Sequence, residues 1–91
     1  MKPIRLDDFL SVCATSFEFD VAYDFDPETG HPLEIGYAVL WREEPEGKSL
    51  VVRPENEGGR IYFLASQYEV TRLGFRKSEG RAIIDIRRKL P

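Results

Sequence analysis

The sequence predicts one α+β domain over residues 1–91, with an N-terminal helix packed on an antiparallel, meander-like sheet of four to six strands. Three observations predict this fold class. Apolar residues near the N-terminus recur at helical spacing, and from residue 17 onward they alternate with polar or small residues. Short loops containing proline, glycine and acidic residues separate the alternating stretches. With 91 residues, 42% of them hydrophobic, the chain has material for one compact core.

The N-terminal segment predicts an amphipathic helix that ends near residues 15–16. One helical face carries, at i, i+3, i+4, i+7 and i+11, the residues Leu6, Phe9, Leu10, Cys13 and Phe17. Asp7 or Asp8 suits the start of the helix, where a carboxylate caps free backbone N–H groups and matches the helix dipole.

Residues 17–25 and 33–42 predict a β-hairpin, because each stretch alternates apolar with polar or small side chains. The loop between them is rich in turn-forming residues. Pro27 suits the second position of a type I turn, and Gly30 supplies the positive φ that closes it.

Four shorter strands are expected at residues 50–53, 61–64, 68–77 and 82–86. The segment 61–64 is apolar on both faces, which predicts a central place in the sheet or cover by the helix. The segment 68–77 is ambiguous. Ser66 and Glu69 match a helix capping box, whereas the β-branched and aromatic residues that follow favour a strand, the interpretation adopted here. A simple meander places the loops 26–32, 54–60 and 78–80 at one end of the sheet. The loop 43–48 and the basic C-terminal segment, Arg87-Arg88-Lys89, then share the other end.

Composition narrows the class of protein. The single cysteine forms no internal disulfide, which favours the reducing cytosol. The apolar runs are too short to span a membrane, and the N-terminus lacks the apolar core of a signal peptide, so a membrane partner is not expected.

Catalytic motifs are not evident, and we expect neither an enzyme nor a bound cofactor or metal. His31, the only histidine, is predicted in a turn, and Cys13 is predicted on an apolar helix face. The spacing of Asp24, Asp26 and Glu28 is like the start of a calcium loop. The match then fails, because the glycine comes one position late and Ile35 occupies the position of the bidentate glutamate.

Charge is segregated along the chain. Residues 1–50 contain 4 Lys/Arg and 11 Asp/Glu, a net charge of −7, whereas residues 51–91 contain 9 and 5, a net charge of +4. The two halves either pair with each other in the fold or present a bipolar surface to a charged partner.

Two candidate binding surfaces follow from this pattern. The outer face of the first strand carries Glu18, Asp20 and Asp24, a row of carboxylates that suits a basic groove on a partner protein. The last 20 residues gather the cations of a candidate nucleic-acid surface, Arg72, Arg76, Lys77, Arg87, Arg88 and Lys89, with Tyr62, Tyr68 and Phe75 as stacking planes. The net charge of −3 for the whole chain opposes binding to a polyanion.

The leading functional hypothesis is therefore a small, non-enzymatic protein-interaction module, an inhibitor or adaptor acting through a charged sheet face. The alternatives are a nucleic-acid-binding protein that uses the basic C-terminal segment, and an acidic inhibitor of a nucleic-acid enzyme, of the type that phages encode. The sequence leaves open whether the chain is a monomer or pairs with a second copy through a sheet edge.

Overall fold

The computed structural model describes residues 2–12 and 18–90. Its elements follow the order β1 (Ile4–Arg5), α1 (Leu6–Val12), β2 (Phe19–Phe25), β3 (Pro32–Glu44), β4 (Gly47–Pro54), β5 (Ile61–Leu64), the 3-10 turn η1 (Ala65–Gln67), β6 (Tyr68–Arg76) and β7 (Arg81–Arg88). Over these described ranges the fold is a small α+β domain, made mostly of strand, as the sequence predicts.

The sheet is mixed rather than purely antiparallel. In the described part of the chain, seven strands pair in the order β1-β6-β7-β2-β3-β4-β5. The segment β2–β5 is the predicted meander, but β7 lies on the other side of β2 and runs parallel to it, with Asp20 opposite Ile83. The prediction of four to six antiparallel strands is therefore wrong in two respects, the parallel β2–β7 pair and the two-residue strand β1.

The central hairpin is confirmed. β2 pairs with β3 in antiparallel register, and the loop closes through hydrogen bonds from the backbone N–H of Asp26 to the carbonyl of His31 and from that of Gly30 to the carbonyl of Asp26. Gly30 has φ +75°, the left-handed conformation that closes this turn, as predicted. The Asp26 carboxylate also accepts a hydrogen bond from the backbone N–H of Glu28, at 2.8 Å.

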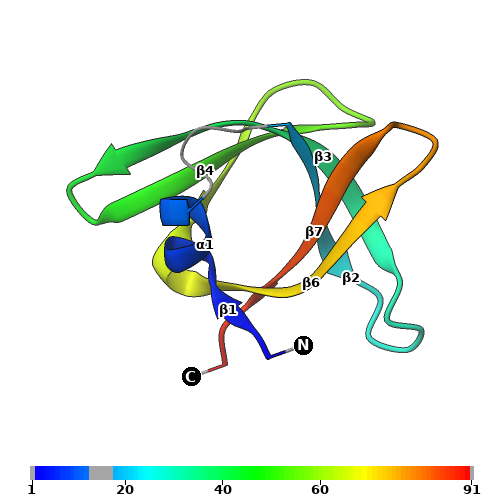
Figure 1. The fold of residues 1–91 in the computed structure, drawn as a ribbon, viewed down its shortest axis with the longest axis horizontal. Coiled ribbons are helices and arrows are strands. Elements are labelled where there is room, and N and C mark those ends of the chain that lie inside the picture. Colours follow the sequence, from blue (N-terminus) through cyan, green and yellow to red (C-terminus); the bar gives the residue numbers. More distant parts are fainter. Residues whose placement is uncertain (1, 13–17, 91) are drawn as a thin grey trace.

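The sheet curls around its own core. Figure 1 shows the strands following one another around a ring, with α1 and η1 on one side of it. The helix contacts η1, β1 and β6, and buries Leu6 and Leu10 completely. The interior of the ring is filled by apolar side chains from the helix and the inner faces of the strands, among them Val21, Leu50 and Ile84. The predicted packing of the helix against the sheet is thus confirmed.

Strands β3 and β4 approach each other very closely at Gly36. A Cβ atom placed on Gly36 would collide with Cγ1 of Val52 and lie 2.7 Å from the carbonyl oxygen of Arg53. Only glycine permits this approach. The register also shifts between Ala38 and Leu40 in the same strand pair, an irregularity of the kind that bends strands.

The remaining element predictions meet different outcomes. Residues 68–76 form a strand, which confirms the strand interpretation against the helix suggested by the capping box. Residues 61–64 form β5 as expected, but this strand ends the sheet order instead of lying centrally. Within the described residues α1 covers 6–12, and the predicted helix positions Cys13 and Phe17 lie outside them, as do residues 15–16.

The predicted grouping of the loops is also wrong, because β7 runs parallel to β2. This direction carries the basic C-terminal segment to the end of β2 that leads into the 26–31 loop, and it sends the β6–β7 turn to the opposite end. The contact of Arg87 with Phe25 confirms the arrangement.

Candidate functional site

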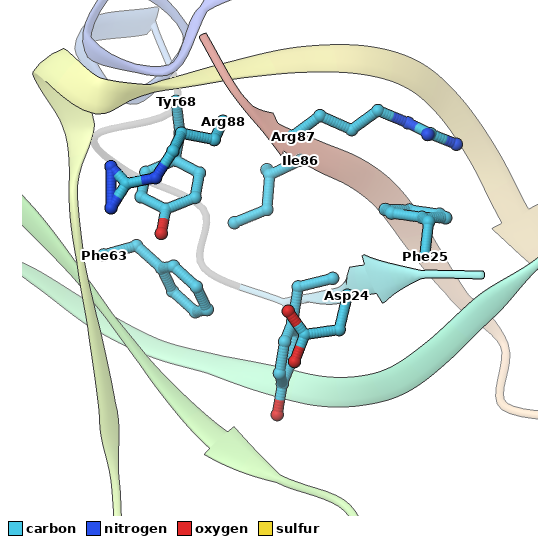
Figure 2. A pocket seen from close by; sticks show the side chains of 8 residues that line it. Asp24, Phe25, Phe63, Tyr68, Ile86, Arg87 and Arg88 are labelled. Atoms are coloured by element: carbon cyan, nitrogen blue, oxygen red, sulfur yellow. The ribbon is translucent and has the colours of Figure 1, made fainter. Parts of the chain in front are cut away.

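A pocket of about 320 Å³ opens at the end of the curved sheet where β2 and β7 finish. We call it the mouth pocket. Figure 2 shows its lining, which comes from β2, β5, β6 and β7: Tyr23, Asp24, Phe25, Phe63, Tyr68, Ile86, Arg87 and Arg88. The lining thus combines four aromatic rings with two guanidinium groups and one carboxylate. Its carboxylate, Asp24, comes from the acidic half of the sequence, and its two arginines come from the basic half.

One side of the mouth pocket is formed where β2 ends. Asp24 has φ +57°, a left-handed conformation that aspartate tolerates better than most residues. Beyond this residue, the ring of Phe25 lies beneath the guanidinium of Arg87, whose central carbon is 3.8 Å from the ring centroid. This distance corresponds to direct stacking, which holds the cation by its flat face and leaves its N–H groups at the edge.

The opposite side is formed around Tyr68. The guanidinium carbon of Arg88 lies 5.5 Å from the centroid of this ring, and its Nη1 donates a hydrogen bond to Oε1 of Gln67 at 3.1 Å. Phe63 packs edge-on against Tyr68 at 5.1 Å between centroids, and in a tilted arrangement against Tyr23 at 5.2 Å. The aromatic cluster therefore continues from the buried core to the rim of the pocket.

Arg87 and Arg88 are exposed, and among the described residues neither forms an ion pair with a carboxylate. Guanidinium groups with free N–H edges bind carboxylates and phosphates in a planar, bidentate way. The aromatic floor between them accepts a flat or apolar group. The arrangement is chemically suited to bind an anionic ligand that also carries a ring or an apolar side chain.

The hydroxyl of Tyr23 is a buried polar group beside this pocket. It has no hydrogen-bond partner in the described part of the chain. Burial raises the pKa of this phenol above its ordinary value, and the negative charges of Glu34, Glu57 and Asp24 raise it further. The folded chain therefore holds the proton of Tyr23 to a higher pH than the unfolded chain does.

The predicted acidic face is not a continuous surface. Glu18 and Asp24 are exposed, but they lie at opposite ends of β2, and Asp20 between them is only 1% exposed. Asp20 accepts hydrogen bonds from Nη1 of Arg76 at 2.9 Å and from Nε of Arg81 at 3.1 Å. The prediction that Asp20 faces solvent is wrong, because the β6–β7 hairpin lies beside β2 and covers this carboxylate with its own cations.

The predicted basic surface is divided between the two ends of the β6–β7 hairpin. Arg76 pairs with Asp20 and Glu55, and Lys77 lies in the exposed turn at one end. At the other end are Arg87 and Arg88, together with the half-buried Lys89. Arg72 lies along β6 and is exposed. The fold thus brings together Arg87, Arg88 and one of the three proposed stacking residues, Tyr68.

The sequence gives no sign that Phe25 and Phe63 belong to the site, because they look like ordinary core positions of alternating strands. The other two proposed stacking rings, Tyr62 and Phe75, are 56% and 65% exposed and do not line the mouth pocket.

A second charged cluster lies on the outer face of the sheet. Arg53 and Arg81 both approach the ring of Tyr37, at 5.4 and 5.1 Å from its centroid, and Arg81 also pairs with Asp20 and Glu79. Because Arg81 is internally neutralised by these carboxylates, the cluster acts first as a clamp between β2, β3 and β7. The hydrogen bonds that Arg81 donates to Asp20 raise the pKa of Arg81. Burial lowers the pKa of Arg76, but its hydrogen bond to Asp20 and the charges of Glu55 and Asp20 outweigh this effect and raise the pKa.

Within residues 2–12 and 18–90, no three His, Cys, Asp or Glu side chains gather closely enough to hold a metal ion. His31 lies in the exposed β2–β3 loop, where its backbone N–H donates to Oγ1 of Thr29. The helix of the described part is too short and polar to cross a membrane.

Comparison with known proteins adds no relative. No protein-family model matches the chain, no curated protein matches it, and no solved structure matches it.

Proposed function

We propose that this chain is a small, non-enzymatic protein-interaction module of the reducing cytosol, and that it binds its partner at the mouth pocket. One observation carries the proposal. Arg87 stacks on Phe25 and Arg88 lies near the ring of Tyr68 around an aromatic-lined pocket, and neither cation forms an ion pair with a carboxylate of the described chain.

Energetic considerations support a binding role for this pocket. The residues that dominate protein interfaces are most often arginine, tyrosine and tryptophan, placed in pockets that exclude water. Stacking on Phe25 restricts the Arg87 side chain before a partner arrives, and the hydrogen bond to Gln67 restricts that of Arg88, which lowers the entropy lost on binding. The location in the cytosol rests on the single cysteine of the sequence.

We do not place the partner on the row of carboxylates that the sequence predicts along β2. A row of carboxylates that imitates a nucleic-acid backbone requires Asp20 at the surface, and this residue is buried against two arginines. We therefore base the proposed interaction on the mouth pocket and not on a phosphate-like row along β2.

The test is a pull-down from native host lysate, read by mass spectrometry, with nuclease-treated and untreated halves. The bait is the wild-type chain, the double variant Arg87→Ala/Arg88→Ala, or the control Arg72→Ala, which removes an exposed cation away from the pocket. We expect one protein to be enriched equally in both halves by the wild type and the control, and to be lost with the double variant. A set of captured proteins that is indifferent to the double variant would overturn the proposal.

A second candidate function is binding to single-stranded nucleic acid. Guanidinium groups beside the half-buried rings of Phe25 and Tyr68 favour it, because such sites bind phosphates and stack bases. The same pull-down decides: enrichment that disappears with nuclease and with the double variant would support this candidate. Such binding should also fall steeply as salt increases.

Self-association stays a prediction. β5 ends the sheet order, and its Tyr62 is exposed. Sedimentation or light scattering of the purified chain measures the oligomeric state directly.

A further inference from the structure

We infer that the segment recognised by the mouth pocket is an acidic peptide with an aromatic or large apolar anchor side chain, the anchor entering the pocket between carboxylates that pair with Arg87 and Arg88. This inference rests on the proposed function and adds the chemistry of the partner.

The size of the pocket argues for one inserted side chain. Its volume of about 320 Å³ is at the lower end of the range of roughly 300–1,000 Å³ found for small-molecule sites. A single ring or branched apolar side chain fills such a space, whereas a dinucleotide cofactor does not.

The walls of the pocket are suited to an apolar or aromatic group. The rings of Phe63 and Tyr68 meet edge to face, so that a further ring finds both a face and an edge to pack against. Ile86, almost fully buried, completes the apolar side. The apolar lining that is still open to water belongs to the half-buried rings of Phe25 and Tyr68, and an inserted apolar side chain would cover it.

The two cations lie on different sides of the pocket. Figure 2 shows Arg87 extended toward Phe25 and Arg88 beside Tyr68, with Ile86 between them. Neighbouring residues of a strand point to opposite faces, so the two guanidinium groups are not arranged to chelate one anion. They instead offer two separate positions for carboxylates, one on each side of an apolar centre.

The acidic groups near the pocket favour a peptide over a nucleic acid. Asp24 lines the pocket, and Glu34 and Glu57 are near enough to affect Tyr23 electrostatically. A nucleic-acid strand carries a charge at every nucleotide and would meet these carboxylates. A peptide can place its acidic residues at the two arginines and neutral residues elsewhere.

Fluorescence anisotropy with defined probes tests the inference. The first probe is a fluorescein-labelled heptapeptide, Gly-Ser-Asp-Phe-Asp-Ser-Gly, which carries one acid on each side of its anchor and neutral residues elsewhere. One matched peptide replaces its phenylalanine with alanine, and another replaces its acids with the corresponding amides. The last probe is a labelled oligothymidylate of six nucleotides. Each is titrated with the wild-type chain, with Arg87→Ala, with Arg88→Ala and with the control Arg72→Ala.

We expect saturable binding of the acidic phenylalanine peptide, weakened roughly tenfold or more by either peptide change and by loss of either arginine. Arg72→Ala should bind as the wild type does. Thermal melting of each variant shows that it is folded, since Arg87 and Arg88 are exposed side chains.

Three results would overturn the inference: no binding of the acidic phenylalanine peptide, equal binding of the amide peptide, or tighter binding of the oligothymidylate. If the pull-down still identifies a protein that depends on Arg87 and Arg88, the proposed function survives and only the partner chemistry is wrong. If no captured protein depends on them, the proposed function itself fails.

Discussion

Asp20 on β2 accepts two hydrogen bonds from Arg81 on β7, a residue 61 positions later in the chain, at 3.1 Å to Oδ1 and 3.4 Å to Oδ2. Because Arg76 also donates to this carboxylate, one buried acid joins the central strand to both ends of the β6–β7 turn. The acidic and basic halves of the sequence thus neutralise each other at this point in the fold.

Replacement of Asp20 by alanine should therefore destabilise the domain. The substitution removes the charge-assisted hydrogen bonds of the buried carboxylate and leaves Arg76 and Arg81, both partly exposed, with Glu55 and Glu79 as partners. The expected loss in the free energy of unfolding is about 1–3 kcal/mol. Urea denaturation followed by circular dichroism measures the loss. The matched control is Glu28→Ala, at an exposed carboxylate that forms no ion pair within the described residues, which should change the free energy of unfolding by less than about 0.5 kcal/mol. Equal stability of Asp20→Ala and wild type would contradict the clamp.

Gly36→Ala tests the close contact of β3 with β4. The added methyl group would collide with Val52 and with the backbone of Arg53, and overpacking of this kind costs about 1–3 kcal/mol. Gly58→Ala is the control, because nothing lies within 4 Å of a Cβ atom there. We expect a lower melting temperature for the first variant and an unchanged or slightly higher one for the second. A similar effect of both would show that glycine flexibility, rather than the close approach, matters at residue 36.

Tyr23→Phe should remove part of the alkaline sensitivity of the fold. Burial raises the pKa of Tyr23, so above about pH 10 the unfolded chain releases this proton before the folded chain does. The unfolded state then binds fewer protons, and the free energy of unfolding falls as the pH rises. The variant keeps the ring but lacks the ionisable hydroxyl. Denaturation at pH 7 and above pH 10 should show a smaller loss than in wild type.

At pH 7 the same variant should be as stable as wild type or about 1 kcal/mol more stable, because a buried hydroxyl without a partner is costly. Tyr62→Phe, at an exposed ring, is the control and should leave the pH profile unchanged. An alkaline loss in Tyr23→Phe as large as in wild type would be inconsistent with this assignment.

Arg87→Lys separates charge from geometry at the mouth pocket. Lysine keeps the positive charge but has no planar group to stack on Phe25, and it offers no bidentate edge to a carboxylate. Titration of the captured partner by calorimetry should show affinity several-fold weaker than for wild type. Arg72→Lys should bind normally. Full affinity of Arg87→Lys would mean that the partner recognises only the positive charge at this position and not the planar guanidinium.

The sequence predicts the local elements well because alternation and turn chemistry act over a few residues. The β2–β3 hairpin follows from its alternating stretches and from Pro27 and Gly30, and β6 follows from its β-branched and aromatic residues. The parallel pairing of β2 with β7 depends on segments about 60 residues apart, and no local pattern encodes it. Strand β1 has only two residues and gives no periodic signal.

The residues of the site are hard to predict for the same reason, because they are brought together by pairings between distant segments. Asp20 looks like a solvent-facing member of an alternating strand, and its burial becomes visible only when β7 is placed beside β2. The cations of the last residues are evident in the sequence, but their division between a buried clamp and the mouth pocket depends on sheet order. Charge alone identifies Arg87 and Arg88 in the sequence, whereas Phe25 and Phe63 have no local feature that distinguishes a rim or floor position from the core.

The place of β7 between β6 and β2 also has a consequence for synthesis on the ribosome. This strand is the last in the sequence, yet it supplies one neighbour of the most buried strand of the sheet. Until residues 81–88 have left the exit tunnel, the nascent β2–β5 meander keeps an open edge and Asp20 lacks Arg81. Such distant pairings slow folding and expose edges that favour aggregation. The domain therefore completes its sheet only after β7 emerges, and a nascent chain stalled before that point is a natural client for chaperones.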